Sequence, residues 1–213
     1  SPYKLYSLND QASLPDVEPG TGVERAISER RSSRIYSGEA ITLEQLSRLL
    51  RFSYGRTNSG TGLHKRAVPS GGALYPLEIY VAARKVDGLE PWIYHYNVEE
   101  HSLDVVSRED RWPDLKECLA LQDMEDPDTC AAVIFVTAIF LRSSVKYNDR
   151  AYRMVLMEAG EVGQNLSLLA TELGLGSYYL GGFIDDHLSE ALEIDGVGEA
   201  PLLPVVLGVP ASS

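Results

Sequence analysis

The chain has 213 residues, of which 44% are hydrophobic and 23% are charged, and its formal net charge is −12. This length and composition are typical of a single folded domain with a substantial core. No apolar run reaches the roughly 18 residues that cross a bilayer, and the negative charge argues against nucleic acid, whose phosphates attract Lys and Arg. We therefore expect no membrane or nucleic-acid partner and, without a signal peptide, a cytoplasmic protein.

The sequence predicts neither a disulfide framework nor a metal site. Its two cysteines, Cys118 and Cys130, have no histidine at metal-ligand spacing, and we interpret them as plain thiols. The histidines are scattered without metal-ligand spacing and are interpreted as structural or surface residues: His64, His95, His101 and His187.

Residues 1–20 are rich in Pro and Gly, so we predict an N-terminal arm or linker followed by one domain over residues 21–213. Thr21 followed by Glu24 is the pattern of a capping box, and it predicts a short helix that ends near Arg31.

A second capping box, formed by Thr42 and Gln45, predicts a helix that ends before Gly55. Residues 55–64 are rich in Gly, Ser, Thr and Asn. Two interpretations of this loop stay open: a mobile cover over a site, or a surface loop without function.

Three segments with alternating, β-branched or aromatic residues, 77–84, 92–97 and 103–106, predict strands of an antiparallel section. Residues 131–141 form a continuous apolar run, which is typical of a central strand covered on both faces. Further short elements are predicted at 177–183 (strand), 185–192 (helix) and 202–207 (strand). The expected class is α+β.

The longest predicted helix extends from Asp149 to about Gly174. Its apolar residues recur at alternating steps of four and three, which places them along one face of the helix: Val155, Ala159, Val162, Leu166, Leu169 and Leu173. This stripe fits either packing into the core or pairing with a helix of a second subunit.

Four arginines fall within ten positions of this acidic chain: Arg25, Arg30, Arg31 and Arg34. The planar guanidinium group suits two-point contact with a phosphate, and the hydroxyl of Ser32 lies within the same stretch. A solvated helix face is the alternative interpretation.

The segment Pro69–Pro76 contains Ser70 followed by Gly71 and Gly72. Residues without a side chain let main-chain N–H groups approach a flat ligand. A plain turn is the alternative, but the arginines and the glycine pair together point to a ligand with a phosphate and a ring.

The order of these segments resembles the FMN-dependent nitroreductase family, and within it the SagB-type branch of azoline dehydrogenases and oxidases. The resemblance covers nearly all of the domain and depends on residues 30–36 (RRSSRIY), 41–50 (ITLEQLSRLL), 69–81 (PSGGALYPLEIYV), 146–153 (KYNDRAYR), 158–176 (EAGEVGQNLSLLATELGLG) and 181–186 (GGFIDD).

The resemblance implies a homodimer with FMN at the subunit interface, a mostly antiparallel central sheet flanked by helices, and a long central helix at that interface. In the family, the FMN phosphate and ribityl chain are held by residues that match Arg30, Arg31, Ser32 and Arg34. The residues that lie along the isoalloxazine, usually from the other subunit, match Pro69, Ser70, Gly71 and Gly72. Its N5 edge is approached by residues that match Gly181 and Gly182.

Lys146 and Tyr147 match a pair that serves the SagB-type branch as a catalytic base. Oxidation of an azoline to an azole removes one hydrogen as hydride and one as a proton, so a base is required. Two departures limit the resemblance: Glu161 stands where the branch commonly has histidine, and no Lys or Arg follows Arg153, although nitroreductases often supply a C-terminal basic residue to the phosphate. Either the N-terminal arginines suffice, or the chain is cut short.

The sequence therefore predicts an FMN-dependent oxidase that aromatises azoline rings in a peptide, either one made ribosomally or one tethered to a carrier protein of a synthetase. Two alternatives stay open, namely an NAD(P)H-dependent nitro or quinone reductase and a flavin-binding scaffold without catalytic activity.

Overall fold

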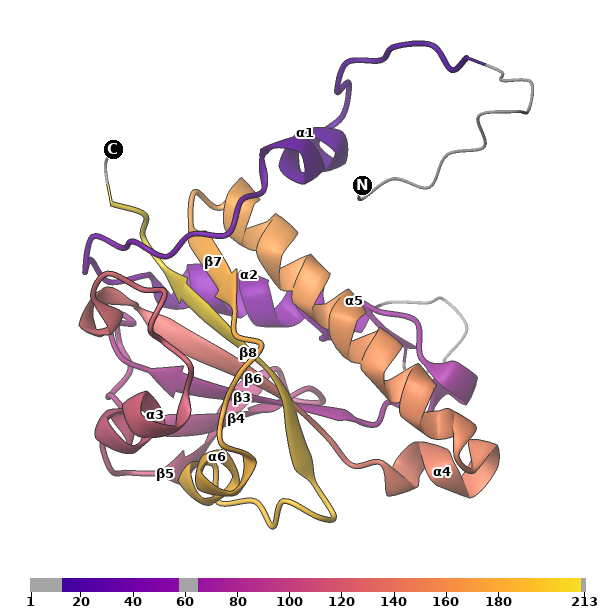
Figure 1. The fold of residues 1–213 in the computed structure, drawn as a ribbon, viewed down its shortest axis with the longest axis vertical. Helices are drawn as coiled ribbons and strands as arrows, with labels where there is room; N and C mark the ends of the chain where they lie inside the picture. The colour runs from indigo at the N-terminus through magenta and orange to yellow at the C-terminus, as the bar shows by residue number, and fades with distance from the viewer. Residues whose placement is uncertain (1–12, 58–64, 212–213) are drawn as a thin grey trace.

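The computed structural model describes residues 13–57 and 65–211, and its centre is one antiparallel sheet of six strands (Figure 1). In space the strands follow the order β5-β4-β3-β6-β8-β7. Their bounds are β3 (Leu77–Ala83), β4 (Ile93–Asn97), β5 (Ser102–Ser107), β6 (Ala132–Ala138), β7 (Gly176–Tyr179) and β8 (Ala200–Gly208).

Helices cover both faces of this sheet. The first hydrophobic cluster lies between the sheet and helices α2 and α5, and the second lies between the sheet and helices α3 and α6. The helices are α1 (Gly22–Glu29), α2 (Leu43–Ser53), α3 (Trp112–Cys118), α4 (Leu141–Tyr147), α5 (Arg150–Glu172) and α6 (Asp185–Ala191). The predicted α+β class with a central antiparallel sheet is confirmed.

Both predicted capping boxes are present. The N–H of Glu24 donates to Thr21 Oγ1 over 3.2 Å, and its carboxylate accepts from the N–H of Thr21 over 2.7 Å. The same reciprocal pair joins Thr42 and Gln45 at the start of α2. Because these contacts satisfy N–H groups that have no partner within the helix, each threonine fixes where its helix begins.

The central strand β6 is buried along its whole length. Val133 and Phe135 belong to the cluster beneath α3 and α6, whereas Ile134 and Val136 belong to the cluster beneath α2 and α5. The continuous apolar run therefore predicts the two-sided burial correctly. The strand ends at Ala138, however, because the chain then turns into α4, which begins at Leu141.

The apolar stripe of α5 packs into the core of its own chain. Its members Val155, Val162 and Leu166 are fully buried against α2 and the sheet. The alternative that this stripe pairs with a helix of a second subunit is therefore wrong. A different face of α5 exposes apolar side chains, including Tyr152 and Met157, which are 61% and 59% exposed.

Several short elements were not expected from the sequence. They are α3, α4, the 3₁₀ helices η1 (Gly71–Ala73) and η2 (Pro127–Thr129), and an antiparallel pair formed by β1 (Arg56–Thr57) and β2 (Lys65–Arg66). The strand predicted at 177–183 is shorter and ends at Tyr179. The loop over 55–64, for which a cover and a surface loop without function stay open, falls mostly on residues 58–64, outside the described residues. Residues 13–20 are exposed without regular structure.

Within residues 13–57 and 65–211, no helix is long and apolar enough to cross a membrane, and no three ligands are grouped for a metal ion.

Gly55 ends α2, as expected, and the structure gives the physical reason. A Cβ on this residue would lie 2.4 Å from the backbone oxygen of Arg51. We predict that Gly55→Ala lowers the free energy of unfolding by about 2 kcal/mol, the usual cost of overpacking, measured by denaturant unfolding. Gly22→Ala is the control, because nothing lies within 4 Å of a Cβ added at this position; equal losses in the two variants would contradict the prediction.

Candidate functional site

The predicted glycine pair and the predicted basic pair meet in the structure. Gly72 has a φ of +68°, and a Cβ built on it would lie 2.7 Å from the hydroxyl of Tyr147 and 2.8 Å from Lys146 Nζ. Both side chains extend from the last turn of α4, which the sequence analysis did not predict. Gly72 therefore has two reasons to be glycine: the left-handed backbone and the polar atoms that occupy the place of a side chain.

The loop that carries the glycine pair is tightly folded. Ser70 Oγ accepts a hydrogen bond from the N–H of Tyr75 over 3.0 Å, and the N–H of Ala73 donates to the carbonyl of Ser70 over 3.0 Å. Ala73 and Tyr75 adopt positive φ values of 56° and 45°, a conformation that costs energy for residues with a Cβ. These bonds hold the backbone of Gly71 and Gly72 in one conformation.

The predicted phosphate-binding segment lies along β7. Ser32 forms a parallel bridge with Ser177, and the N–H of Ser33 donates to the carbonyl of Ser177 over 2.9 Å. The Arg34 guanidinium stacks 4.2 Å from the centroid of the Tyr178 ring. The segment therefore has a defined course, not that of a freely solvated run of charge.

The arginine side chains of this segment have no carboxylate partner. Among the residues that the structure describes, no Asp or Glu lies within ion-pair distance of Arg25, Arg30, Arg31 or Arg34, although the chain is strongly acidic. Arg31 instead donates to the carbonyls of Ser28 and Arg30 over 2.8 and 2.9 Å. This positive charge is available to an anionic ligand.

The second predicted glycine pair follows β7. The carbonyl of Gly182 accepts from the N–H of Ala120 over 3.0 Å, which fixes the backbone. Nothing described lies within 4 Å of a Cβ built on Gly181. The surface beside Gly181 is therefore open to a ligand, and no packing within the described chain explains this glycine.

A single chain does not bring all the predicted site residues together. The arginine segment pairs with β7, which directly follows the C-terminal end of α5. Gly71 instead faces Met154 near the N-terminal end of α5, where a Cβ built on Gly71 would lie 3.1 Å from Met154 Sδ. The 23 residues of α5 span about 35 Å. Figure 1 shows α1 beside one end of this helix and α4 beside the other.

Next to the glycine loop lies a buried polar cluster that the sequence analysis missed. Glu158 of α5 is only 3% exposed and accepts a hydrogen bond from the hydroxyl of Tyr54 over 3.2 Å. Burial raises the pKa of the Glu158 carboxyl. Arg66 stacks on two rings, 4.4 Å from the centroid of Tyr54 and 5.0 Å from that of Tyr75. The signal was a glutamate inside the apolar stripe of α5.

Two polar atoms near this cluster are buried without a hydrogen-bond partner in the described structure, Arg66 Nη1 and Glu161 Oε2. Such groups cost free energy, and in native proteins almost all of them are paired. Glu161 is the residue that stands where the SagB-type branch commonly has histidine. A ligand with polar groups at this place would satisfy both atoms.

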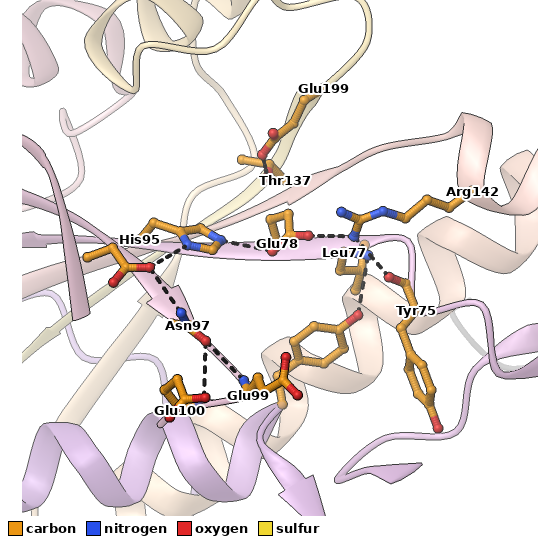
Figure 2. A network of polar contacts seen from close by, with 12 residues as sticks. Tyr75, Leu77, Glu78, His95, Asn97, Glu99, Glu100, Thr137, Arg142 and Glu199 are labelled. Carbon is orange, nitrogen blue, oxygen red and sulfur yellow. Dashed lines mark hydrogen bonds and ion pairs between the residues drawn. The ribbon is translucent and has the colours of Figure 1, made fainter. Parts of the chain in front are cut away.

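A second polar network crosses the sheet and reaches α4 (Figure 2). The carboxylate of Glu78 on β3 forms an ion pair with Arg142 of α4, and its Oε2 lies 2.9 Å from His95 Nε2. Burial opposes ionisation of Glu78, but its hydrogen bonds with His95 and Arg142 outweigh this effect and lower its pKa. The hydrogen bond with Glu78 raises the pKa of His95. The sequence predicts His95 only as a structural or surface residue.

The comparisons with known proteins agree with this geometry. The model of the nitroreductase family matches residues 27–209. The chain belongs to the nitroreductase family. It is 39% identical over 195 residues to "Putative nitroreductase MJ1384" of Methanocaldococcus jannaschii, a match that covers 92% of this chain and 94% of that protein.

Two further relatives are named as processing proteins. The chain is 29% identical over 173 residues to the microcin B17-processing protein McbC of Escherichia coli, with 79% of this chain and 62% of McbC covered. It is 32% identical over 143 residues to the trifolitoxin-processing protein TfxB of Rhizobium leguminosarum bv. trifolii, with 63% of this chain and 38% of TfxB covered. The chain thus spans less than two thirds of either protein.

Solved structures share the fold. A chain of the McbBCD microcin synthetase complex of Escherichia coli matches with a TM-score of 0.76 and 24% identity. The match covers 97% of this chain and 80% of the McbBCD chain. A nitroreductase-like protein from Desulfovibrio desulfuricans, solved in complex with FMN, matches with a TM-score of 0.63 and 21% identity, covering 91% and 89% of the two chains.

The residues of this chain fit FMN. Gly181 leaves main-chain surface uncovered for a flat ring. The arginines near β7 have no carboxylate partner among the described residues. Arg66 Nη1 is a buried donor beside the glycine loop without an acceptor. A ring with polar edges and a terminal phosphate would satisfy each of these features.

The His95–Glu78 contact predicts a stability that depends on pH. Protonated His95 stabilises the fold, and this contribution is fully present below pH 6.5, the ordinary pKa of histidine. It is lost as the pH rises through the raised pKa of His95. Ionised Glu78 stabilises the fold above pH 4.5, the ordinary pKa of glutamate. This contribution is lost as the pH falls through the lowered pKa of Glu78. The stability difference between wild type and His95→Gln, measured by urea unfolding, should therefore be largest between pH 4.5 and 6.5.

The control for this measurement is the same comparison in a Glu78→Gln background, which removes the partner of His95. We expect the pH dependence of the difference to shrink strongly there. An identical pH dependence in both backgrounds would contradict the coupling between the two side chains.

Proposed function

We propose that this protein is an FMN-dependent dehydrogenase or oxidase that converts an azoline ring of a peptide into the aromatic azole. The observation that carries the proposal is the approach of Lys146 Nζ and the Tyr147 hydroxyl to Gly72. The similarity to McbC, a microcin B17-processing protein, supports a peptide as substrate. The substrate is either a free peptide or one tethered to a carrier protein.

The reaction needs two acceptors. Conversion of a thiazoline or oxazoline to the azole removes two hydrogens, and FMN supplies the chemistry that accepts one of them as hydride. The other leaves carbon as a proton, which Tyr147 Oη would take with the positive charge of Lys146 beside it. Lys146 Nζ lies 5.4 Å from the centroid of the Tyr147 ring, so the two side chains approach the same place.

The protein's own residues would hold the cofactor at its two ends. Arg30, Arg31, Ser32 and Arg34 would bind the phosphate and the ribityl chain through charge-assisted hydrogen bonds. The segment 69–72 would lie along the ring, and Gly181 and Gly182 would leave its reactive edge uncovered. Arg66, with its unpaired Nη1, would donate to a carbonyl oxygen of the ring.

A homodimer would bring the two groups of residues together, because they lie at opposite ends of α5 within one chain. Exposed apolar side chains beside the glycine loop support such an interface. On α4 and α5 they include Leu141, Val145, Tyr152 and Met157, which are 59% to 73% exposed. Contact with a second copy would remove this apolar surface from water and would bring the second group of residues to the site.

The second candidate function is an NAD(P)H-dependent nitro or quinone reductase. The observation in its favour is the 39% identity to MJ1384 over nearly the full length of both proteins. Such an enzyme passes electrons to its substrate and has no need for a base that removes a proton from carbon. The two functions therefore differ in their need for Lys146 and Tyr147.

The basic pair tests the proposal directly. We predict that Lys146→Met and Tyr147→Phe each reduce the rate of azole formation at least 100-fold, a usual contribution of a general base, while the Kd for FMN changes less than threefold. Azole formation is measured by mass spectrometry as the loss of two hydrogens from a peptidyl thiazoline, and FMN binding by flavin fluorescence.

The matched control is Lys116→Met. Lys116 pairs with Asp128 on the other side of the sheet, away from the glycine loop. Full activity in Lys146→Met and Tyr147→Phe would overturn the proposed role of the pair.

The arginine segment gives a separate prediction. Arg31→Gln and Arg34→Gln should each weaken FMN binding roughly 10-fold or more, the worth of a hydrogen bond to a charged group. The affinity for riboflavin, which lacks the phosphate, should stay unchanged. Arg48→Gln, which alters a surface ion pair of α2, is the control. A parallel loss of riboflavin affinity would show that these arginines do not read the phosphate.

A further inference from the structure

One arginine connects the helix of the basic pair to the loop of the glycine pair. Arg142 Nη1 donates to the carbonyl of Tyr75 over 3.3 Å and also contacts the carboxylate of Glu78. Tyr75 belongs to the glycine loop, and Glu78 belongs to β3. Figure 2 shows Arg142 extending from α4 toward both partners. The same guanidinium therefore fixes α4 relative to the loop and to the sheet.

Arg142 is well placed to control Lys146. The two residues are four positions apart on α4, so they lie one turn apart on the same face of the helix. Tyr147 follows directly. A rotation or shift of α4 that breaks the contact of Arg142 therefore also moves both members of the pair.

The helix itself supplies little that would hold it in place. Helix α4 has seven residues and no side-chain cap, and Ser143 is its only buried residue. Leu141 and Val145 are 67% and 73% exposed in the single chain. Helices this short are marginal without tertiary contacts. Within one chain, the contacts of Arg142 connect α4 to the glycine loop and to the sheet.

The acceptor side of the anchor is rigid. The side chain of Glu78 is only 14% exposed, and its other oxygen lies 2.9 Å from His95 Nε2. The backbone of Glu78 pairs with Thr137 in the central strand β6. On its far side, His95 Nδ1 faces the carboxylate of Asp104 at 4.0 Å. Glu78 is thus held by His95 and by the pairing of β3 with the central strand, independently of α4.

We propose that Arg142 is a positioning residue: held by Glu78 and by the carbonyl of Tyr75, it sets Lys146 and Tyr147 against the glycine pair at the distance that proton removal requires. This inference rests on the proposed function, because it assigns a purpose to the placement of the basic pair. Arg142 itself touches no reacting atom. Misplacement of a catalytic group by about 1 Å lowers a rate by about 10²-fold.

The experiment compares Arg142→Met, Arg142→Lys and Arg150→Met in the FMN-loaded protein. Arg150 is the matched control, because it is an exposed arginine at the start of α5, and its replacement removes the same charge close to α4. Arg142→Lys keeps the charge and one donor for Glu78, so it should recover part of the effect. Azole formation from a peptidyl thiazoline gives kcat and KM for each variant.

We expect Arg142→Met to lower kcat about 30-fold or more, on the scale of a small misplacement, with KM and the Kd for FMN within twofold of wild type. Arg142→Lys should lie between Arg142→Met and wild type, and Arg150→Met should match wild type. If kcat of Arg142→Met stays within twofold of wild type, or if Arg150→Met loses as much, the inference is overturned.

A second readout keeps this test separate from the proposed function. The rate at which Lys146 reacts with a limiting amount of an amine-specific reagent, followed by peptide mass spectrometry, reports the surroundings of Nζ without any turnover. Arg142→Met should change this rate at least threefold, and Arg150→Met should not; equal rates in all variants overturn the inference. A wild-type protein that forms no azole overturns the proposed function instead, and the labelling comparison then decides the positioning role.

Discussion

The close approach at Gly72 is the constraint on which the site depends. A residue with no side chain and a φ of +68° lets the Tyr147 hydroxyl and Lys146 Nζ occupy the place where a Cβ would be. The loop holds this conformation through the hydrogen bond from the Tyr75 N–H to Ser70, and α4 holds the basic pair through Arg142. Loop and helix therefore act as one unit, fixed to the central sheet.

Helix α5 separates the two halves of the site. The apolar stripe of α5 packs into the core of its own chain. Beside the stripe, near the glycine loop, Glu158 is buried, and Glu161 Oε2 has no hydrogen-bond partner among the described residues. The arginine segment lies by the other end of α5. Under the proposed function, a complete cofactor site would therefore require a second chain, and the exposed apolar side chains of α4 and α5 would offer a surface for it.

Periodic patterns and caps predicted most of the fold, because they act locally. The capping boxes at Thr21 and Thr42 mark where two helices begin, and the apolar run before Ala138 marks the central strand. Helix α4 was missed because the same apolar run continues into its first turn and no capping side chain marks its start. The role of the α5 stripe could not be decided from its spacing, since core packing and helix pairing share one pattern. The contacts of Arg142 join residues more than sixty positions apart, and no local pattern reveals them.

The central claim is that this site removes hydrogen from an azoline instead of passing electrons to a nitro compound or a quinone. Anaerobic reduction of the FMN-loaded protein, followed at the flavin absorption band, tests it most directly. The account predicts that a peptidyl thiazoline bleaches the flavin with formation of one equivalent of azole, and that NADPH does so slowly. Rapid bleaching by NADPH with no reaction of the thiazoline would contradict the account and would assign the protein to the reductases of its family.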